Sequence, residues 1–163
     1  MHLRSVAALA AAGFALLATA APLAQAAPPP APGPPTVSVA AGGAPLKDTV
    51  ICNVTAIKPN LSGIRVTGTG GISSCTPHAP YSCSSDVDLE FYNEYSSRWM
   101  TGATSPRQYS CPPPARWTTA ATTCVSQPAD RQIAWRSVAV GAIVYGTTST
   151  KEAYSAVLYV PCA

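Results

Sequence analysis

The chain has 163 residues, a length that suits one domain with its own hydrophobic core. Its 10 Lys and Arg and 7 Asp and Glu give a formal net charge of +3, too small to indicate a nucleic-acid partner. Only 10% of the residues are charged, against roughly 25% in typical globular domains. Because exposed helices rely on Lys and Glu, this composition argues against a helical bundle.

The N-terminal region has the three parts of a secretory signal peptide. Arg4 supplies a positive charge, residues 6–21 form an apolar run that Pro22 ends, and Ala24-Gln25-Ala26 offers small residues to a signal peptidase. A membrane span needs about 20 apolar residues, so this run is too short for an anchor. We predict that residues 1–26 are a signal peptide and that the product is secreted, extracellular and not attached to a membrane after cleavage.

Residues 27–35, Ala-Pro-Pro-Pro-Ala-Pro-Gly-Pro-Pro, form a proline-rich linker. Proline fixes φ and lacks a backbone donor, so this segment cannot form a helix or join a sheet. It is predicted to be an extended polyproline II spacer. The alternative is a docking peptide for an aromatic groove.

Residues 36–163 are predicted to form a single β domain, because short runs rich in Val, Ile, Thr, Tyr and Trp alternate with Gly, Pro, Ser and Asn. No stretch has sustained helical periodicity. This pattern predicts an all-β fold, either an antiparallel immunoglobulin-like sandwich or a small barrel stapled by disulfides. The expected strands span residues 36–40, 49–58, 63–69, 86–92, 95–101, 116–125, 133–145 and 153–160.

The segment after Gly63 is predicted to end in a turn, since residues 68–71 read Gly-Thr-Gly-Gly. This sequence lacks the third glycine and the following helix of a dinucleotide-binding loop. A hairpin turn before Cys75 is therefore expected. Gly141 and Gly146 are expected to bend or end the long apolar strand at residues 133–145.

The clearest strand is residues 86–92, where acidic and apolar residues alternate strictly. A period of two places Val87, Leu89 and Phe91 on the core side and the carboxylates in water. Successive carboxylates along a flat strand lie about 7 Å apart and diverge. A solvated face is favoured over a calcium site, so no metal is expected.

The six cysteines all lie after the linker, and an even number in an exported chain indicates three disulfides. Sequence alone permits about 15 pairings. The sequential set is favoured: Cys52 with Cys75, Cys83 with Cys111, and Cys124 with Cys162. Loss of such a bridge from a small secreted domain typically costs about 2–5 kcal/mol.

His78 is the only histidine that remains after cleavage, because His2 leaves with the leader. It is the one side chain with an ordinary pKa near neutrality, which makes it a candidate general base for a nearby serine. The chain has no Gly-x-Ser-x-Gly motif, however. One histidine with cysteines that pair in disulfides also leaves too few ligands for a metal.

Exposed aromatic and arginine side chains are the best candidates for ligand binding, because Trp, Tyr and Arg dominate interface energetics. They cluster in the middle of the sequence, with Tyr92 and Arg107 among them. The candidate binding residues are Tyr95, Arg98, Trp99, Tyr109, Arg116 and Trp117. The alternative is that Trp99 and Trp117 are simply core residues.

Three segments together resemble a known group: Val50-Ile51-Cys52-Asn53-Val54, residues 68–75, and the final strand that ends at Cys162. They are similar to the short, disulfide-containing secreted proteins of actinobacteria, which carry signal peptides and have no characterised activity. The Ala-rich leader and the preference for Arg over Lys fit bacterial export. The resemblance implies export, β structure and disulfides, and it supplies no catalytic residue or cofactor.

The favoured hypothesis is a secreted, non-enzymatic binding module whose ligand is a cell-wall glycan or a protein, without a cofactor. The first alternative is a protease inhibitor, because residues 110–114 and 75–83 are candidates for disulfide-braced loops. The second is a hydrolase that uses His78. The inhibitor predicts a rigid exposed loop, and the hydrolase predicts a cleft that joins His78 to a serine and a carboxylate.

Overall fold

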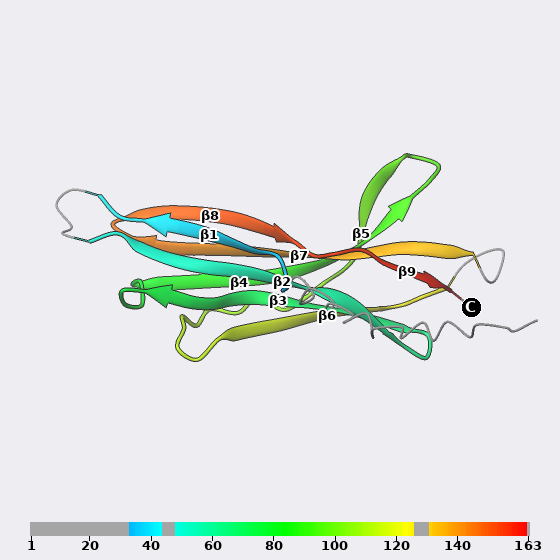
Figure 1. The fold of residues 1–163 in the computed structure, drawn as a ribbon, viewed down its shortest axis with the longest axis horizontal. Helices are drawn as coiled ribbons and strands as arrows, with labels where there is room; N and C mark the ends of the chain where they lie inside the picture. Colours follow the sequence, from blue (N-terminus) through cyan, green and yellow to red (C-terminus); the bar gives the residue numbers. More distant parts are fainter. Residues whose placement is uncertain (1–32, 44–47, 126–130, 163) are drawn as a thin grey trace, which may run out of the picture. The chain divides into compact units, whose positions relative to one another are not determined.

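The computed structural model describes residues 33–43, 48–125 and 131–162. The predicted signal peptide lies outside the described residues, as do residues 27–32 of the proline-rich linker. Within the described part, no helix is long and apolar enough to cross a membrane. The described chain is built from β-strands joined by turns and loops (Figure 1).

The strands are antiparallel and form two sheets that pack as a sandwich, so the all-β prediction is confirmed and the barrel alternative is not needed. One sheet has the order β1-β2-β3-β6, and the other has the order β5-β4-β7-β8, with β9 also paired to β7. The strand bounds are β1 Thr36–Ala41, β2 Val50–Ser62, β3 Arg65–Thr76, β4 Ser82–Asn93, β5 Arg98–Thr104, β6 Arg116–Thr123, β7 Gln132–Tyr145, β8 Thr147–Tyr154 and β9 Leu158–Pro161.

The core lies between the sheets and follows the alternation expected from the sequence. On β4, Val87 and Leu89 are fully buried, and the carboxylates of the same strand are partly exposed on the other face. The facing core residues include Val54 and Ile72 from the first sheet and Ile143 from β7. The prediction for residues 86–92 is thus correct in its inward and outward faces.

The prediction of one final strand at residues 153–160 is wrong, because the chain forms β8 and β9 with an interruption at Ser155. Both strands pair with the same edge of β7, first through Val138–Tyr145 and then through Gln132–Trp135. Between them, the Ser155 hydroxyl accepts a hydrogen bond from the Ser137 amide at 2.9 Å. The interruption shifts the alternation by one residue, and so Tyr154 and Tyr159 lie on the same outer face.

Residues 68–71 do not form the predicted hairpin turn but lie inside β3. Gly68 and Gly70 lie where the two sheets approach each other, and their lack of a side chain is needed there. A Cβ atom at Gly70 would lie 2.7 Å from Ala139 Cβ, and one at Gly68 would lie 2.6 Å from Ser137 Oγ. Gly141 does not end β7, which continues to Tyr145, and a Cβ at Gly141 would lie 2.5 Å from a Val54 methyl.

Gly146 does end β7, as expected from the sequence. Its φ of 71° is in the left-handed region, where glycine is favoured, and it joins β7 to β8 in a tight hairpin.

Three disulfides link elements that are far apart in the sequence. Cys52 on β2 is bonded to Cys75, its cross-strand partner on β3, with Cα atoms 4.0 Å apart. Cys83 on β4 is bonded to Cys111, and Cys124, after β6, is bonded to Cys162, after β9. These are the three pairs of the sequential scheme. Such bonds form and persist in an oxidising compartment.

Candidate functional site

The six binding residues expected from the sequence do not form one surface. Tyr95, Arg98 and Trp99 belong to the β4–β5 hairpin, Tyr109 lies in the loop before β6, and Arg116 and Trp117 begin β6 in the opposite sheet. Trp117 is 40% exposed on the outer face of that sheet, whereas Trp99 is half-buried. Neither of these two indoles is a core residue, and they belong to strands of different sheets.

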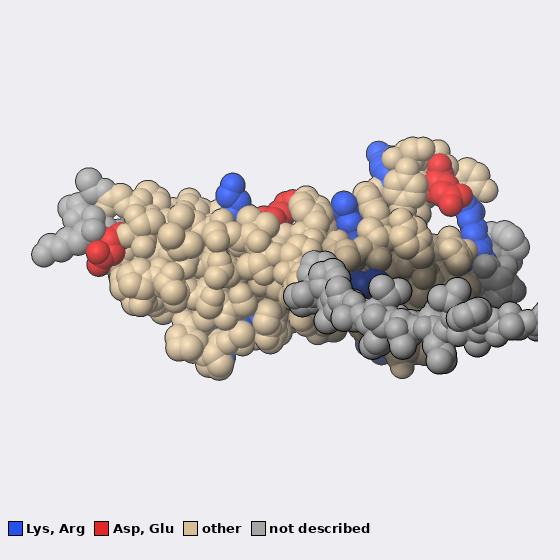
Figure 2. Space-filling view, in the orientation of Figure 1, with Lys and Arg blue, Asp and Glu red and all other residues tan. Residues whose placement is uncertain are grey.

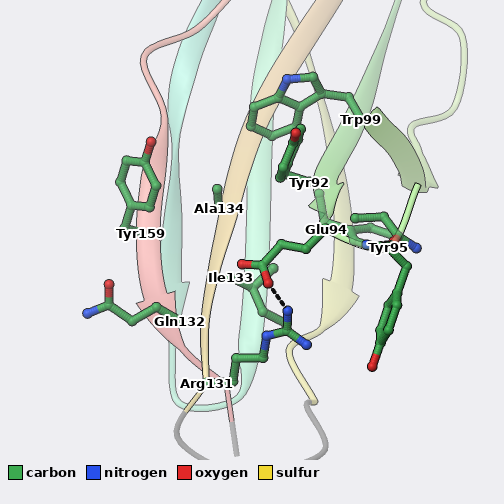
Figure 3. Close-up of a pocket in the computed structure, with 11 residues that line it drawn as sticks. Tyr92, Glu94, Tyr95, Trp99, Arg131, Gln132, Ile133, Ala134 and Tyr159 are labelled. Atoms are coloured by element: carbon green, nitrogen blue, oxygen red, sulfur yellow. Dashed lines mark hydrogen bonds and ion pairs between the residues drawn. The ribbon is translucent and has the colours of Figure 1, made fainter. Parts of the chain in front are cut away.

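A groove of about 660 Å³ lies beside the β4–β5 hairpin on the outer side of the second sheet. We call it the hairpin groove. Figure 3 shows Tyr159 on one side of Ala134 and Tyr92 with Trp99 on the other, above an ion pair between Glu94 and Arg131. The lining residues are Phe91, Tyr92, Asn93, Glu94, Tyr95, Trp99, Arg131, Gln132, Ile133, Ala134 and Tyr159.

The groove exists because two paired strands separate. β4 pairs with β7 as far as Phe91 opposite Trp135. Beyond that point β4 continues into the hairpin with β5, which stands away from the sheet (Figure 1), while β7 pairs with β9 on its other edge. The long side chains of Glu94 and Arg131 bridge the gap between the separated strands.

The tip of the hairpin is fixed by its own side chains. The Asn93 side-chain oxygen Oδ1 accepts hydrogen bonds from the backbone amides of Tyr95 at 2.9 Å and Ser96 at 3.2 Å. Ser97 adopts a positive φ of 51°, which reverses the chain direction before β5. This turn holds Tyr95 at the tip, where the side chain is 94% exposed.

A row of stacked side chains crosses the outer face of the second sheet and ends at the groove. The Arg136 guanidinium lies 4.3 Å from the Trp99 ring centre and 4.8 Å from that of Tyr154. Trp99 in turn meets Tyr92 in an edge-on contact, with ring centres 5.5 Å apart. Glu90, on β4, forms an ion pair with Arg136, with its Oε2 atom 2.7 Å from Arg136 Nε. We call Tyr154, Arg136, Trp99 and Tyr92 the aromatic stack.

Tyr159, Arg136 and Tyr154 are outside the aromatic and arginine cluster noted in the sequence, and Tyr92 belongs to that cluster but is not one of the six candidates. Tyr92 continues the outward alternation of Asp86, Asp88 and Glu90, so the same period of two was enough to find it. The outward direction of Tyr159 could not be predicted, because the expected continuous strand places Tyr159 on the face opposite Tyr154. The alternation of apolar and polar residues does not indicate that the strand is interrupted at Ser155.

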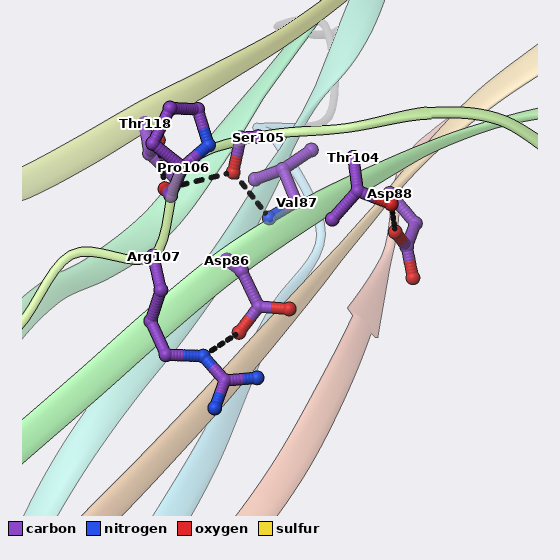
Figure 4. Close-up of polar contacts among 8 residues, drawn as sticks. All are labelled: Asp86, Val87, Asp88, Thr104, Ser105, Pro106, Arg107 and Thr118. Atoms are coloured by element: carbon purple, nitrogen blue, oxygen red, sulfur yellow. Dashed lines mark hydrogen bonds and ion pairs between the residues drawn. The ribbon is translucent and has the colours of Figure 1, made fainter.

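Each carboxylate of the acidic row on β4 has a hydrogen-bond partner, and Asp86 and Glu90 form ion pairs with arginines. Figure 4 shows Arg107 bonded to Asp86, at 3.0 Å, and the Thr104 hydroxyl donating to Asp88. In the same view the Ser105 hydroxyl accepts from the Val87 amide at 2.9 Å, where β5 leaves β4. Among the described residues, no group of three His, Cys, Asp or Glu side chains is placed to hold a metal ion.

His78 is exposed and lies at the opposite end of β7 from the groove, next to Tyr145. Its Nδ1 lies 3.0 Å from the carbonyl oxygen of Ala79, and its Nε2 lies 3.4 Å from the Tyr145 hydroxyl. Burial, followed by the proximity of Tyr81 and Asp48, raises the pKa of Tyr145. In the described part of the chain, neither ring nitrogen of His78 bonds to a serine or a carboxylate, which a hydrolytic triad would need.

The groove is lined by few charges, and the two that line it, Glu94 and Arg131, form an ion pair with each other. Figure 2 shows a face that is mostly free of Lys, Arg, Asp and Glu, with acidic and basic groups side by side around the hairpin. Tyr154 donates a hydrogen bond to Glu152, and this bond, followed by burial, raises the pKa of Tyr154. The groove therefore presents neutral aromatic rings and a compensated ion pair.

No protein-family model matches the chain, and no curated protein matches it in sequence. The resemblance to secreted actinobacterial proteins stays a prediction, and the function is argued from the geometry of the site.

Proposed function

We propose that this protein is a secreted, non-enzymatic binding module that holds an extracellular ligand in the hairpin groove. The observation that supports this most is the concentration of exposed aromatic rings in one cavity. Tyr92, Tyr95 and Tyr159 line it together with Trp99, and Tyr159 is 66% exposed. Concave sites lined by aromatic side chains with a few polar groups are typical of ligand binding.

The groove is also preorganised. Tyr92 and Tyr159 stand on paired strands, and the aromatic stack holds Trp99 between Arg136 and Tyr92. A binding surface whose rings are already fixed loses little conformational entropy when a ligand arrives. Such rigidity favours recognition by stacking.

Two observations support an extracellular location. Three disulfides are typical of proteins in an oxidising compartment, and the first 26 residues have the organisation of a cleavable signal peptide. The ligand is then a molecule of the cell wall or the surrounding medium.

The exported protein, with its disulfides formed, tests the proposal in a binding assay on isolated cell walls and on purified extracellular proteins. Tyr159→Ala removes a groove ring, and Tyr109→Ala removes a similarly exposed tyrosine, 72% accessible, outside the groove. We expect the bound fraction to fall at least about tenfold for Tyr159→Ala and to stay unchanged for Tyr109→Ala. Equal binding by both variants, or no binding by the unaltered protein, would contradict the proposal.

A protease inhibitor is the second candidate, because the loop at residues 105–115 is braced. The Cys83–Cys111 bond ties it to β4, and the backbones of Gln108 and Ser85 exchange two hydrogen bonds of 2.8 Å. The Arg116 side chain donates to the Cys111 carbonyl at 3.2 Å. Tyr109 projects from this rigid support.

Inhibition is tested by incubating the protein with subtilisin, trypsin and chymotrypsin. The inhibitor proposal predicts a slower rate for at least one protease and recovery of that rate with Tyr109→Ala. Unchanged rates for all three proteases would discard this candidate and leave the binding module.

A further inference from the structure

We infer that the ligand of the hairpin groove is a neutral polysaccharide chain. This inference rests on the proposed function and names the ligand class. It depends on three features of the groove: the arrangement of its rings, its unpaired polar groups and its balanced charge.

The rings form separate stacking positions along one surface. Tyr159 and Tyr92 flank the small side chain of Ala134, and Tyr95 lies beyond the ion pair at the hairpin tip (Figure 3). Since Ala134 leaves the space between the tyrosines open, a flat apolar ring face can pack against either wall. Several positions in succession suit a chain of sugar rings better than a single small molecule.

Polar groups lie next to these rings. The exposed amide of Gln132 has no hydrogen-bond partner among the described residues, and the same holds for the hydroxyls of Tyr92 and Tyr159. An amide supplies both donors and an acceptor, and a phenol supplies a donor and an acceptor. Sugar hydroxyls, which also donate and accept, match these groups, while the aromatic faces match the C–H faces of the sugar ring.

The charge of the groove favours a neutral ligand over an acidic polymer. Glu94 and Arg131 are the charged residues that line it, and they form an ion pair with each other. Arg136, behind Trp99, is paired with Glu90. An anionic glycan or a nucleic acid would need unpaired cations in the groove to offset the loss of hydration of its charged groups.

The same ion pair argues against an added peptide strand. β4 and β7 separate after Phe91 and Trp135, so a peptide would have to pair with the β7 edge at residues 132–134. The Glu94 and Arg131 side chains cross that gap. A strand could enter only by breaking the pair, whereas a sugar chain on the outer face leaves it intact.

Isothermal titration calorimetry of the exported protein with cellohexaose, fully N-acetylated chitohexaose and polygalacturonate tests the inference. We expect one of the two neutral hexasaccharides to bind with a dissociation constant of about 1 mM or tighter. Its affinity should change less than about twofold between about 0.01 M and about 1 M salt, because an uncharged ligand is not screened. Binding to polygalacturonate alone, with steep salt dependence, would overturn the inference.

Variants assign the binding to the groove. Tyr159→Ala should weaken the neutral hexasaccharide about tenfold or more, and Tyr159→Phe, which keeps the ring, should weaken it less. Trp117→Ala, on the opposite sheet, is the matched control and should have no effect. Equal losses for Tyr159→Ala and Trp117→Ala would place the ligand elsewhere and overturn the inference.

The failure of this inference can be told apart from failure of the proposed function. If neither hexasaccharide binds, but an extracellular protein binds and Tyr159→Ala abolishes that binding, the polysaccharide assignment is wrong and the binding module stands. If no ligand of any class depends on Tyr159 or Tyr92, both are wrong.

Discussion

The outer faces of the two sheets obey the same alternation but present different chemistry. On the first sheet, short polar side chains bond across strands: Ser38 to Asn53 at 2.9 Å, Asn53 to Ser74 at 3.1 Å, and Thr69 to Thr119 at 3.0 Å. The second sheet has charged pairs and aromatic rings. Short polar side chains satisfy one another across paired strands, whereas longer side chains line a groove where two strands separate.

The separation of strands thus distinguishes the outer face without a groove from the one with the proposed binding groove. The first sheet keeps β2, β3 and β6 paired along most of their length. In the second sheet, β4 leaves β7 and the hairpin groove opens. Four variants test whether the groove depends on local features of the second sheet or on the stability of the whole domain.

The largest effect is expected from the double variant Cys124→Ser with Cys162→Ser. This bond closes a loop of 38 residues and holds the chain end next to β9, which presents Tyr159. Its loss should lower the free energy of unfolding by about 2–5 kcal/mol, measured by urea denaturation. Amide hydrogen exchange should rise in β9, because its end is no longer tethered.

Cys52→Ser with Cys75→Ser is the matched control for that variant. This bond joins neighbouring strands of the first sheet. It should also lower the free energy of unfolding, while hydrogen exchange in β9 stays low. If hydrogen exchange in β9 increased equally in both double variants, the Cys124–Cys162 bond would have no special effect on the groove beyond its effect on the stability of the whole domain.

Gly70→Ala tests the close approach of the two sheets. The added Cβ would lie 2.7 Å from Ala139 Cβ and 2.8 Å from the Thr55 carbonyl oxygen, so the backbone must shift. Overpacking of this kind typically costs about 1–3 kcal/mol. Gly43→Ala, whose added Cβ would meet a Thr147 methyl at an ordinary 3.8 Å, should change the free energy of unfolding by less than about 0.5 kcal/mol.

If Gly70→Ala leaves the free energy of unfolding unchanged, the two sheets are packed more loosely than these distances indicate. Urea denaturation of both glycine variants under the same conditions gives the comparison.

Arg136→Lys tests the aromatic stack. Lysine keeps the charge next to Glu90 but lacks the planar group that lies between Trp99 and Tyr154. A cation–π contact at such a half-exposed site is worth about 0.5–1 kcal/mol. The expected result is a decrease of this size in the free energy of unfolding and a red shift in the fluorescence of Trp99. Because the chain has three tryptophans, the Trp99 emission is obtained by subtracting the spectrum of the Trp99→Phe variant.

Arg107→Lys is the control on the same face, because Arg107 pairs with Asp86 without contacting an aromatic ring. It should leave Trp99 fluorescence unchanged. An identical spectral shift for both arginine variants would show that the emission does not report on the stack.

Most of the fold was predictable from local sequence pattern. The alternation at residues 86–92 places Val87 and Leu89 correctly in the core, and the even number of cysteines correctly indicates three disulfides. The glycines at residues 68–71 were assigned to a turn because a lone sequence does not distinguish a glycine that bends the chain from one that makes room for a facing sheet. Gly70 is in a strand because Ala139 packs against it from the other sheet.

The site was less predictable because it depends on contacts between distant segments. Tyr92 and Tyr159 are 67 positions apart in the sequence and meet at one groove because β4 and β9 flank β7. Periodicity alone could place Tyr92 outward, but not Tyr159, whose face depends on the interruption at Ser155. The clustering of Trp99 and Trp117 in sequence was misleading, since β5 and β6 belong to different sheets.

The smallest effect is expected at alkaline pH from Tyr154→Phe. The bond to Glu152 raises the pKa of Tyr154 in the folded state. Tyr154 therefore binds its proton more tightly when folded, and this contribution to stability is present below the ordinary tyrosine pKa of about 10 and is lost as pH rises through the raised pKa. Because the ring is half-exposed and solvent screens it, the contribution is about 0.5 kcal/mol or less.

Thermal unfolding between about pH 9 and pH 11 measures this difference. The unaltered protein should lose more stability over that range than Tyr154→Phe, which has no proton to lose. Glu152→Gln keeps the phenol but removes the negative charge beside it, so its pH dependence should lie between the two. A steeper alkaline loss in Tyr154→Phe than in the unaltered protein would contradict the role of this bond at the far end of the aromatic stack.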